Sequence, residues 1–178
     1  MDFRIQAGCP RFTGEYDEDI SSLSDALEIV FPLWTEDMII MWKTICIPIG
    51  YKYDMSLMID DILNILETLR TRVSGEISVH WPSNSFACKW DLTWDSNNLV
   101  IRSEWENVVG KTENLLQQSG HIVTTKEIFQ SEWKRVLKNV IDGMTYSGFS
   151  AVAFPEMVRL ITEFNAINNE GILYNEQL

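Results

Sequence analysis

The feature that most constrains the fold is a strict alternation of apolar and polar residues between positions 86 and 95. Every second residue has an apolar or thiol side chain, and these are Phe86, Cys88, Trp90, Leu92 and Trp94. Four of the five residues that alternate with them, from Lys89 to Asp95, are polar. Because successive side chains of a β-strand point to opposite faces, the pattern predicts a strand with one buried face and one wet face.

The segments on either side repeat this alternation. Ile77, Val79 and Trp81 come before it, separated by a turn at residues 82–85, and Leu99 opens a similar run after a short turn at residues 96–98. Prolines, serines and asparagines at such positions favour tight turns. Three half-buried strands joined by short turns predict an antiparallel meander.

Helical patterns surround the meander. Apolar residues recur at helical spacing from Met55 to Val73, with Asp54 as the predicted cap and a stop near Ser74-Gly75. Thr124-x-x-Glu127 is a capping box that opens a second long helix, which we expect to end at Ser147-Gly148. Two shorter helices are also predicted. One starts with the box Ser22-x-x-Asp25 and ends before Pro32, and the other has Pro155 as its first helical residue.

Three segments are harder to interpret. Phe3 to Ala7 alternates like a short strand. Met38 to Ile49 is almost uninterruptedly apolar, which predicts one strand covered on both faces, with a bulge or exit at Pro48. Val108 to Gly120 fits either an irregular strand or a helix of one to two turns.

The order of these elements indicates the fold class. Strands grouped in a meander, with helices segregated in the chain, predict an α+β fold in which helices pack mainly on one face of an antiparallel sheet. At 178 residues, the chain is expected to form a single domain over residues 1–178. We expect the polar residues 168–178 to be a frayed tail.

No pattern of residues identifies a reaction. The sequence lacks Gly-x-Ser-x-Gly, a Walker loop and Gly-x-Gly-x-x-Gly, so no catalytic residue or cofactor is predicted. Cys-x-x-Cys is absent and His80 and His121 stand alone, so no metal site is predicted. Cys9, Cys46 and Cys88 are expected to be free, buried thiols in a reducing compartment.

Charge and apolar runs indicate which partners to expect. A formal net charge of −12 argues against binding to nucleic acid, because that affinity comes mainly from clustered lysines and arginines. The longest apolar stretch, Met38 to Ile49, is too short for a membrane span. The first residues show no signal-peptide pattern, so we expect a cytoplasmic protein.

The acidic surplus is concentrated near the N-terminus. Residues 1–37 hold two basic and nine acidic residues, a net charge of −7. Four of these acids surround one aromatic residue in the segment Glu15, Tyr16, Asp17, Glu18 and Asp19. A solvated loop is the simpler interpretation. The functional alternative is a face that meets a basic partner, with Tyr16 and Trp34 as aromatic anchors.

One stretch carries a family resemblance. Residues 124–137, Thr-Thr-Lys-Glu-Ile-Phe-Gln-Ser-Glu-Trp-Lys-Arg-Val-Leu, follow an all-β run and are similar to immunity proteins of bacterial toxin systems, including contact-dependent growth inhibition. Small, acidic α+β proteins rich in aromatic residues also resemble this class. The resemblance implies a protein that binds and neutralises a cognate toxin domain, often a nuclease with a basic cleft. It assigns no functional residue.

Two other functions are compatible with the same residues. One is an enzyme with an acidic, hydrolase-like site, lined by residues such as Asp91 and Glu104. The other is a phage or mobile-element protein that blocks a host nucleic-acid enzyme. A neighbouring toxin gene would favour the immunity protein, whereas a concave pocket with shifted carboxyl pKa values would favour the enzyme.

Overall fold

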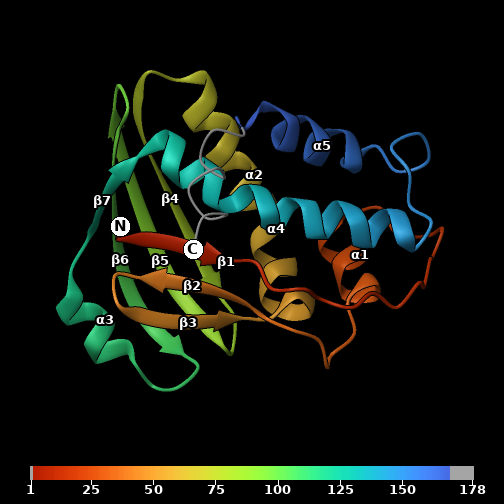
Figure 1. The fold of residues 1–178 in the computed structure, drawn as a ribbon, viewed down its shortest axis with the longest axis horizontal. Helices are drawn as coiled ribbons and strands as arrows, with labels where there is room; N and C mark the ends of the chain where they lie inside the picture. The colour runs from red at the N-terminus through yellow and green to blue at the C-terminus, as the bar shows by residue number, and fades with distance from the viewer. Residues whose placement is uncertain (1, 169–178) are drawn as a thin grey trace, which may run out of the picture.

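In the computed structural model, which describes residues 2–168, the chain forms two antiparallel sheets and five α-helices (Figure 1). The elements in chain order are β1 (Phe3–Gln6), α1 (Leu23–Val30), β2 (Met38–Trp42), β3 (Ile45–Ile49), a π-helical turn η1 (Tyr51–Met55), α2 (Ser56–Thr71), β4 (Ser74–Pro82), β5 (Phe86–Asp95), β6 (Asn98–Val108), α3 (Glu113–Ser119), β7 (Ile122–Thr125), α4 (Lys126–Tyr146) and α5 (Glu156–Ala166). The predicted α+β class is therefore confirmed.

The larger sheet contains the predicted meander. Its strand order is β4-β5-β6-β7, and β7 is a fourth strand that the sequence patterns did not predict. Val79 pairs with Trp90, and Trp90 pairs with Ser103, so β5 lies between its two neighbours in the chain. Cys88, Trp90, Leu92 and Trp94 are all buried, as the alternation predicted. The ambiguous segment 108–120 contains helix α3.

The smaller sheet corrects one prediction. Residues 38–49 form a hairpin of two strands, β2 and β3, joined at Lys43, whose φ of 55° allows a tight reversal. Only one face of this hairpin is buried, so the apolar run was wrongly interpreted as a strand covered on both sides. Pro48 stays in the sheet opposite Ile39, on the outer strand β3, where a missing N–H is tolerated.

The two sheets and the helices share one core. In Figure 1, the small sheet and helices α2 and α4 lie on the same side of the larger sheet. Phe3 of β1 and Trp42 of β2 both contact the indole of Trp90, with ring centroids 6.0 and 5.7 Å away. The other face of the larger sheet carries exposed or half-exposed polar residues. The prediction of helices mainly on one face therefore describes this sheet well.

Helix boundaries follow the predicted capping signals with small shifts. Ser22 caps α1 as expected, by accepting from Asp25 N–H at 3.1 Å. Helix α4 is capped by Thr125, one residue later than predicted, and Thr125 is also the last residue of β7. Helix α2 ends at Thr71, and Gly75 lies in β4 under the indole of Trp94, where a Cβ atom would come within 2.7 Å of the ring. Pro155 precedes α5 as its cap rather than as its first residue.

Asp54 has a role different from the predicted cap of α2. It is buried in η1 and accepts a hydrogen bond from the N–H of Gly50, at 2.9 Å, and from the hydroxyl of Ser83. The carboxyl of Asp37 lies close by, and its pKa is raised by burial and by the charge of Asp54. Asp54 thus ties the start of η1 to the β4–β5 turn.

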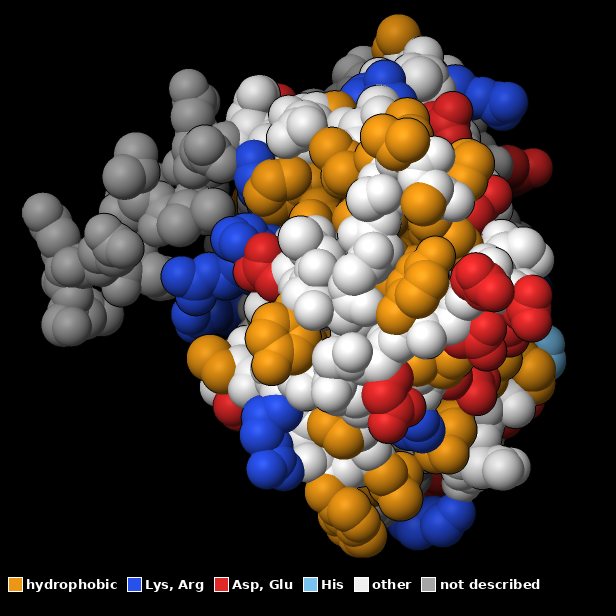
Figure 2. Space-filling model, turned by 90° about the vertical axis from the view of Figure 1, so that its right-hand side faces the viewer, with side chains coloured by type: hydrophobic (Ala, Val, Ile, Leu, Met, Phe, Trp, Pro, Cys, Tyr) orange, Lys and Arg blue, Asp and Glu red, His pale blue; other side chains and the backbone are white. Residues whose placement is uncertain are grey.

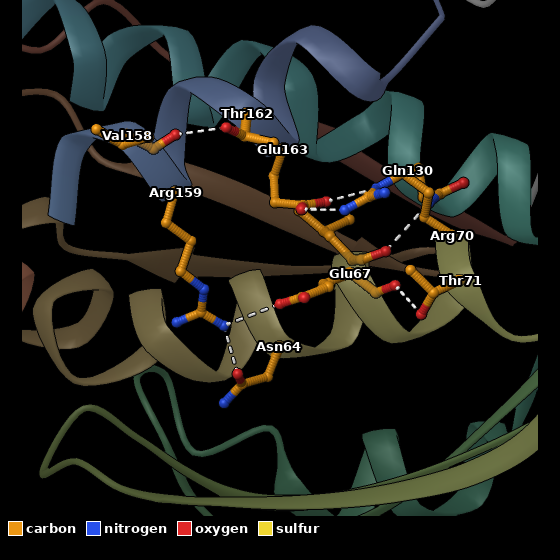
Figure 3. Close-up of polar contacts among 10 residues, drawn as sticks. Asn64, Glu67, Arg70, Thr71, Gln130, Val158, Arg159, Thr162 and Glu163 are labelled. Carbon is orange, nitrogen blue, oxygen red and sulfur yellow. Dashed lines mark hydrogen bonds and ion pairs between the residues drawn. The ribbon is translucent and has the colours of Figure 1, made fainter. Parts of the chain in front are cut away.

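Helix α5 is attached to α2 by polar contacts (Figure 3). The buried carboxylate of Glu163 accepts two hydrogen bonds from Arg70, at 2.6 and 3.2 Å. One turn earlier, Arg159 donates to Asn64 and lies 3.7 Å from Glu67. The predicted tail at residues 168–178 lies outside the described residues, apart from its first residue.

Candidate functional site

The predicted acidic segment is an ordered, exposed loop before α1. Glu15, Tyr16, Asp17, Glu18 and Asp19 are all exposed, and together with Ile29 they line a shallow hollow. The carboxylate of Asp17 accepts from the N–H of Asp19 at 2.9 Å, and the ring of Tyr16 packs edge to face on Phe149, with centroids 4.8 Å apart. Contacts at Asp17 and Tyr16 therefore fix the loop locally, while its acidic side chains remain in water.

Trp34 is the most exposed aromatic side chain of the described residues, with 81% of its surface accessible. It lies in the loop after α1. The guanidinium of Arg11 donates to the carbonyl of Trp34, and the N–H of Arg11 donates to Thr35 Oγ1 at 2.6 Å. The indole is therefore displayed on a backbone that is fixed by hydrogen bonds.

The chain from Arg11 to Glu15 connects these two features. Thr13 donates its N–H to the carbonyl of Val30 at 2.9 Å and its hydroxyl to the carbonyl of Ile29 at 2.8 Å. This segment thus follows the C-terminal end of α1, with Trp34 at one end of it and the acidic hollow at the other. Trp34 does not line the hollow. The predicted partner-binding residues share one end of the molecule but form two separate spots.

Figure 2 shows the end of the molecule that lies on the right of Figure 1, where α1 is found. Acidic side chains gather along one side of this view, and hydrophobic side chains are scattered over the rest of it. Large apolar side chains exposed in the structure include Leu33 next to Trp34, with 57% of its surface accessible. Acidic surface therefore lies beside scattered apolar surface at this end of the molecule.

A second concave region, which the sequence did not indicate, runs between β1 and α4. It is a groove of about 700 Å³ with polar residues on both walls. On the α4 wall, Glu132 accepts the N–H of Ile5 at 2.6 Å, and Asn139 donates to the carbonyls of Ala7 and Gly8 at 3.2 Å each. These side chains satisfy backbone groups at the free edge of β1 and in the two residues that follow it. The seven-residue spacing of Glu132 and Asn139 puts both on one helix face, but only docking of β1 reveals their role.

The groove brings together charges of both signs. Arg4, Arg135 and Lys138 line it beside Glu132 and Asp142, and Lys138 pairs with Asp142 at 2.7 Å. Burial raises the pKa of Glu132, while the hydrogen bond from Ile5 and the charge of Arg4 act in the opposite direction. Carboxyl groups with a raised pKa that line a groove occur in active sites, and they also occur where the carboxyl only stabilises the fold.

The acids suggested for a hydrolase-like site lie elsewhere, on the solvent face of the larger sheet. Lys89 donates to Asp91 at 3.0 Å and lies 4.0 Å from Glu104. Hydrogen bonds from Ser78 and Lys89 lower the pKa of Asp91, which favours its ionised form. Neither acid lines the groove or the acidic hollow. The pair is thus arranged as a surface ion network.

The cysteines differ from one another. All three are free, but only Cys88 is buried, whereas Cys9 and Cys46 are exposed. The expectation that all three are buried is therefore wrong. Cys9 lines the β1–α4 groove, after β1 has ended, and Cys46 points outward from β3 opposite Met41. Apolar residues next to a cysteine in the sequence do not show whether its side chain points into the core.

Within residues 2–168, no three His, Cys, Asp or Glu side chains are grouped so that they could hold a metal ion. No helix in the described part of the chain has the length and apolar character needed to cross a bilayer. Comparison of the chain with known protein families, curated proteins and solved structures gave no match. The geometry of the surfaces described above is therefore the basis for a functional proposal.

Proposed function

We propose that this protein is an immunity protein, which acts in the cytoplasm by binding and neutralising a cognate toxin domain. The observation that supports this most directly is Trp34, exposed over 81% of its surface on a loop that Arg11 holds in place. A large aromatic side chain gains stability by burial, so its display in water is typical of an interface anchor.

The acidic segment supports a basic partner. Exposed carboxylates contribute little to folding, and clustered ones repel each other. Facing a basic surface, they speed association and favour the correct orientation. A nuclease domain carries such a surface because its cleft must attract phosphates. We therefore propose that the hollow at Glu15–Asp19 faces the toxin's basic cleft while Trp34 packs at its side.

The same surface would serve a protein that blocks a host nucleic-acid enzyme, and only the partner would differ. The enzyme alternative has one observation in its favour, the β1–α4 groove with Glu132. A hydrolytic site there would use Glu132 in its protonated form, which its raised pKa favours. Against this, the carboxylate already binds the N–H of Ile5 and completes the edge of β1.

Calorimetric titration against the protein encoded beside this chain tests the proposal. We expect tight binding by the wild type and about 30-fold weaker binding by Trp34→Ala, since anchors contribute about 2 kcal/mol or more. Val123→Ala is the matched control. This side chain is 57% exposed on β7, which Figure 1 shows at the opposite side of the molecule from α1. Its affinity should equal that of the wild type.

Three results would contradict the proposal. Absence of binding to the neighbouring gene product, together with binding to a host nucleic-acid enzyme, would favour the mobile-element inhibitor. Equal affinities of Trp34→Ala and Val123→Ala would place the interface elsewhere. Hydrolytic turnover by the purified protein that is lost in Glu132→Gln would favour the enzyme.

A further inference from the structure

Strand β4 forms an open edge of the larger sheet. It is the outermost strand of the order β4-β5-β6-β7, and at nine residues it is more than twice as long as the opposite edge strand β7. No backbone hydrogen bond from outside the sheet reaches β4 within the described residues. Five of its residues are exposed, namely Ser74, Glu76, Ser78, His80 and Pro82. A long edge that residues 2–168 leave uncovered is a template for pairing with another strand.

The β5–β6 turn determines which backbone groups of β4 point outward. Asp95 and Asn98 flank a two-residue turn and therefore form a hydrogen-bonded pair. Counting back along β5, the backbone of Trp90 then faces β4, where it meets Val79. Because the direction alternates, Ser78 and every second residue on either side of it turn their N–H and C=O groups to the open edge. Pro82 occupies such a position, where its missing N–H removes no bond from its own sheet.

We propose that this edge pairs antiparallel with β4 of a second copy of the chain, around a two-fold axis at Ser78. The sheet would then continue from one copy into the other. In this register, Glu76 lies opposite His80 of the partner subunit, and His80 lies opposite Glu76 of the partner subunit. On the inner face, Ile77 lies opposite Val79 of the partner subunit, which extends the apolar side of the sheet.

The pairing of a carboxylate with an imidazole selects this register. A centre at residue 76 would oppose Glu76 to its own copy, and a centre at residue 80 would do the same to His80. A centre at residue 77 or 79 would oppose Glu76 and His80 to serine or proline, which cannot pair with them. Only the centre at Ser78 places Glu76 and His80 opposite each other across the edge. It also pairs all nine residues of β4 with the second copy. His80 lies 2.9 Å from Glu106 in its own subunit, so its imidazole would be shared between two carboxylates.

A single strand edge buries less surface than the roughly 1,200–2,000 Å² of a stable interface. We therefore expect a dimer that forms in a concentration-dependent manner. Sedimentation velocity of the wild type should show the mass rise from 20.6 kDa towards twice that value as concentration increases. A wild type that stays monomeric up to millimolar concentration would overturn the proposal.

Backbone blocking tests the edge directly. Ser78→Pro removes the central outward N–H while leaving the β4–β5 ladder intact, so the dimer should be lost and the circular dichroism spectrum retained. Ser78→Ala is the matched control. It changes the same side chain but keeps the N–H, and should dimerise like the wild type. A dimer that persists in a folded Ser78→Pro variant would show that another surface is used.

Charge exchange tests the register without a proline. Glu76→Lys and His80→Glu should each weaken self-association at least tenfold, because one opposes two basic groups and the other opposes two carboxylates. A mixture of the two single variants restores complementarity at both contacts and should form heterodimers. The double variant Glu76→Lys/His80→Glu should again dimerise with itself. Equal self-association of both single variants and the wild type would refute this register.

Discussion

Trp42 of β2 and Trp90 of β5 contact each other across the two sheets, with ring centroids 5.7 Å apart. Trp90 also contacts Phe3 of β1 at 6.0 Å and Trp81 of β4 at 5.0 Å. One fully buried indole thus touches three other strands and both sheets. The small sheet is therefore part of the same core as the meander.

Replacement of this indole should be among the most destabilising single changes in the chain. We expect Trp90→Ala, and equally Trp133→Ala in the buried face of α4, to lower the free energy of unfolding by about 3–5 kcal/mol. Trp90→Phe should cost less, because the indole N–H of Trp90 has no hydrogen-bond partner to lose. Urea denaturation measures all three. Trp34→Ala is the exposed control, and a loss of comparable size there would contradict this account.

The sequence patterns predicted those elements whose signals are local. Alternation at residues 86–95 and the boxes at Ser22 and near Thr124 report on burial and capping within a few residues, and the structure agrees with them. The run at residues 38–49 misled because apolar content does not mark a reversal. The turn depends on the positive φ of Lys43. Lysine adopts this conformation only rarely, so its presence in the sequence does not predict a turn.

The candidate site was predictable to a similar degree. Charge clustering identified Glu15–Asp19, and isolation from any periodic pattern singled out Trp34. The hydrogen bonds from Arg11 that fix Trp34 link residues more than twenty positions apart, and no short-range pattern reports on them. The hydrogen bond between Ile5 and Glu132 in the groove links residues 127 positions apart, so the sequence could not predict it for the same reason.

The contact between α2 and α5 gives a second prediction. Arg70→Met would leave the carboxylate of Glu163 buried without its partner, which costs about 3–5 kcal/mol for a fully buried pair. The Arg70 side chain is 37% exposed, so solvent reduces this, and we expect about 2 kcal/mol. Thermal and urea unfolding provide the measurement. Arg159→Ala removes only exposed partners and should cost less than about 1 kcal/mol; the reverse order would contradict the assignment.

The raised pKa of Glu132 predicts a specific pH dependence. Its folded pKa lies above the ordinary value of 4.5, so the folded state binds this proton more tightly than the unfolded state. Stability should therefore fall as pH rises from 4.5 through the folded pKa. In Glu132→Gln, this part of the decline should disappear, as measured by urea unfolding across the range. A decline that persists unchanged in Glu132→Gln would contradict this assignment.

Thiol reactivity should separate the three cysteines. Burial raises the pKa of Cys88 well above its usual range, so its reactive thiolate is almost absent in the folded protein. Titration of the native protein with a thiol reagent should therefore modify Cys9 and Cys46 quickly and Cys88 only after unfolding. Cys88→Ser should leave the fast phase unchanged. A third fast-reacting thiol in the native wild type would show that β5 is less protected than the structure indicates.

The acidic loop gives the last prediction. Replacement of Glu15, Asp17, Glu18 and Asp19 by their amides should leave the melting temperature nearly unchanged, because all four side chains are exposed. The amide that replaces the carboxylate of Asp17 retains an oxygen that can accept from the backbone N–H two residues later, so the turn should persist. Association with the proposed toxin partner should slow and lose much of its salt dependence, since exposed charges act mainly by steering. Dissociation should change little if Trp34 supplies most of the contact energy. Stopped-flow kinetics at low and high salt measure both rates. An unchanged association rate at low salt would move the interface to the solvent face of the meander, around Lys89 and Arg102.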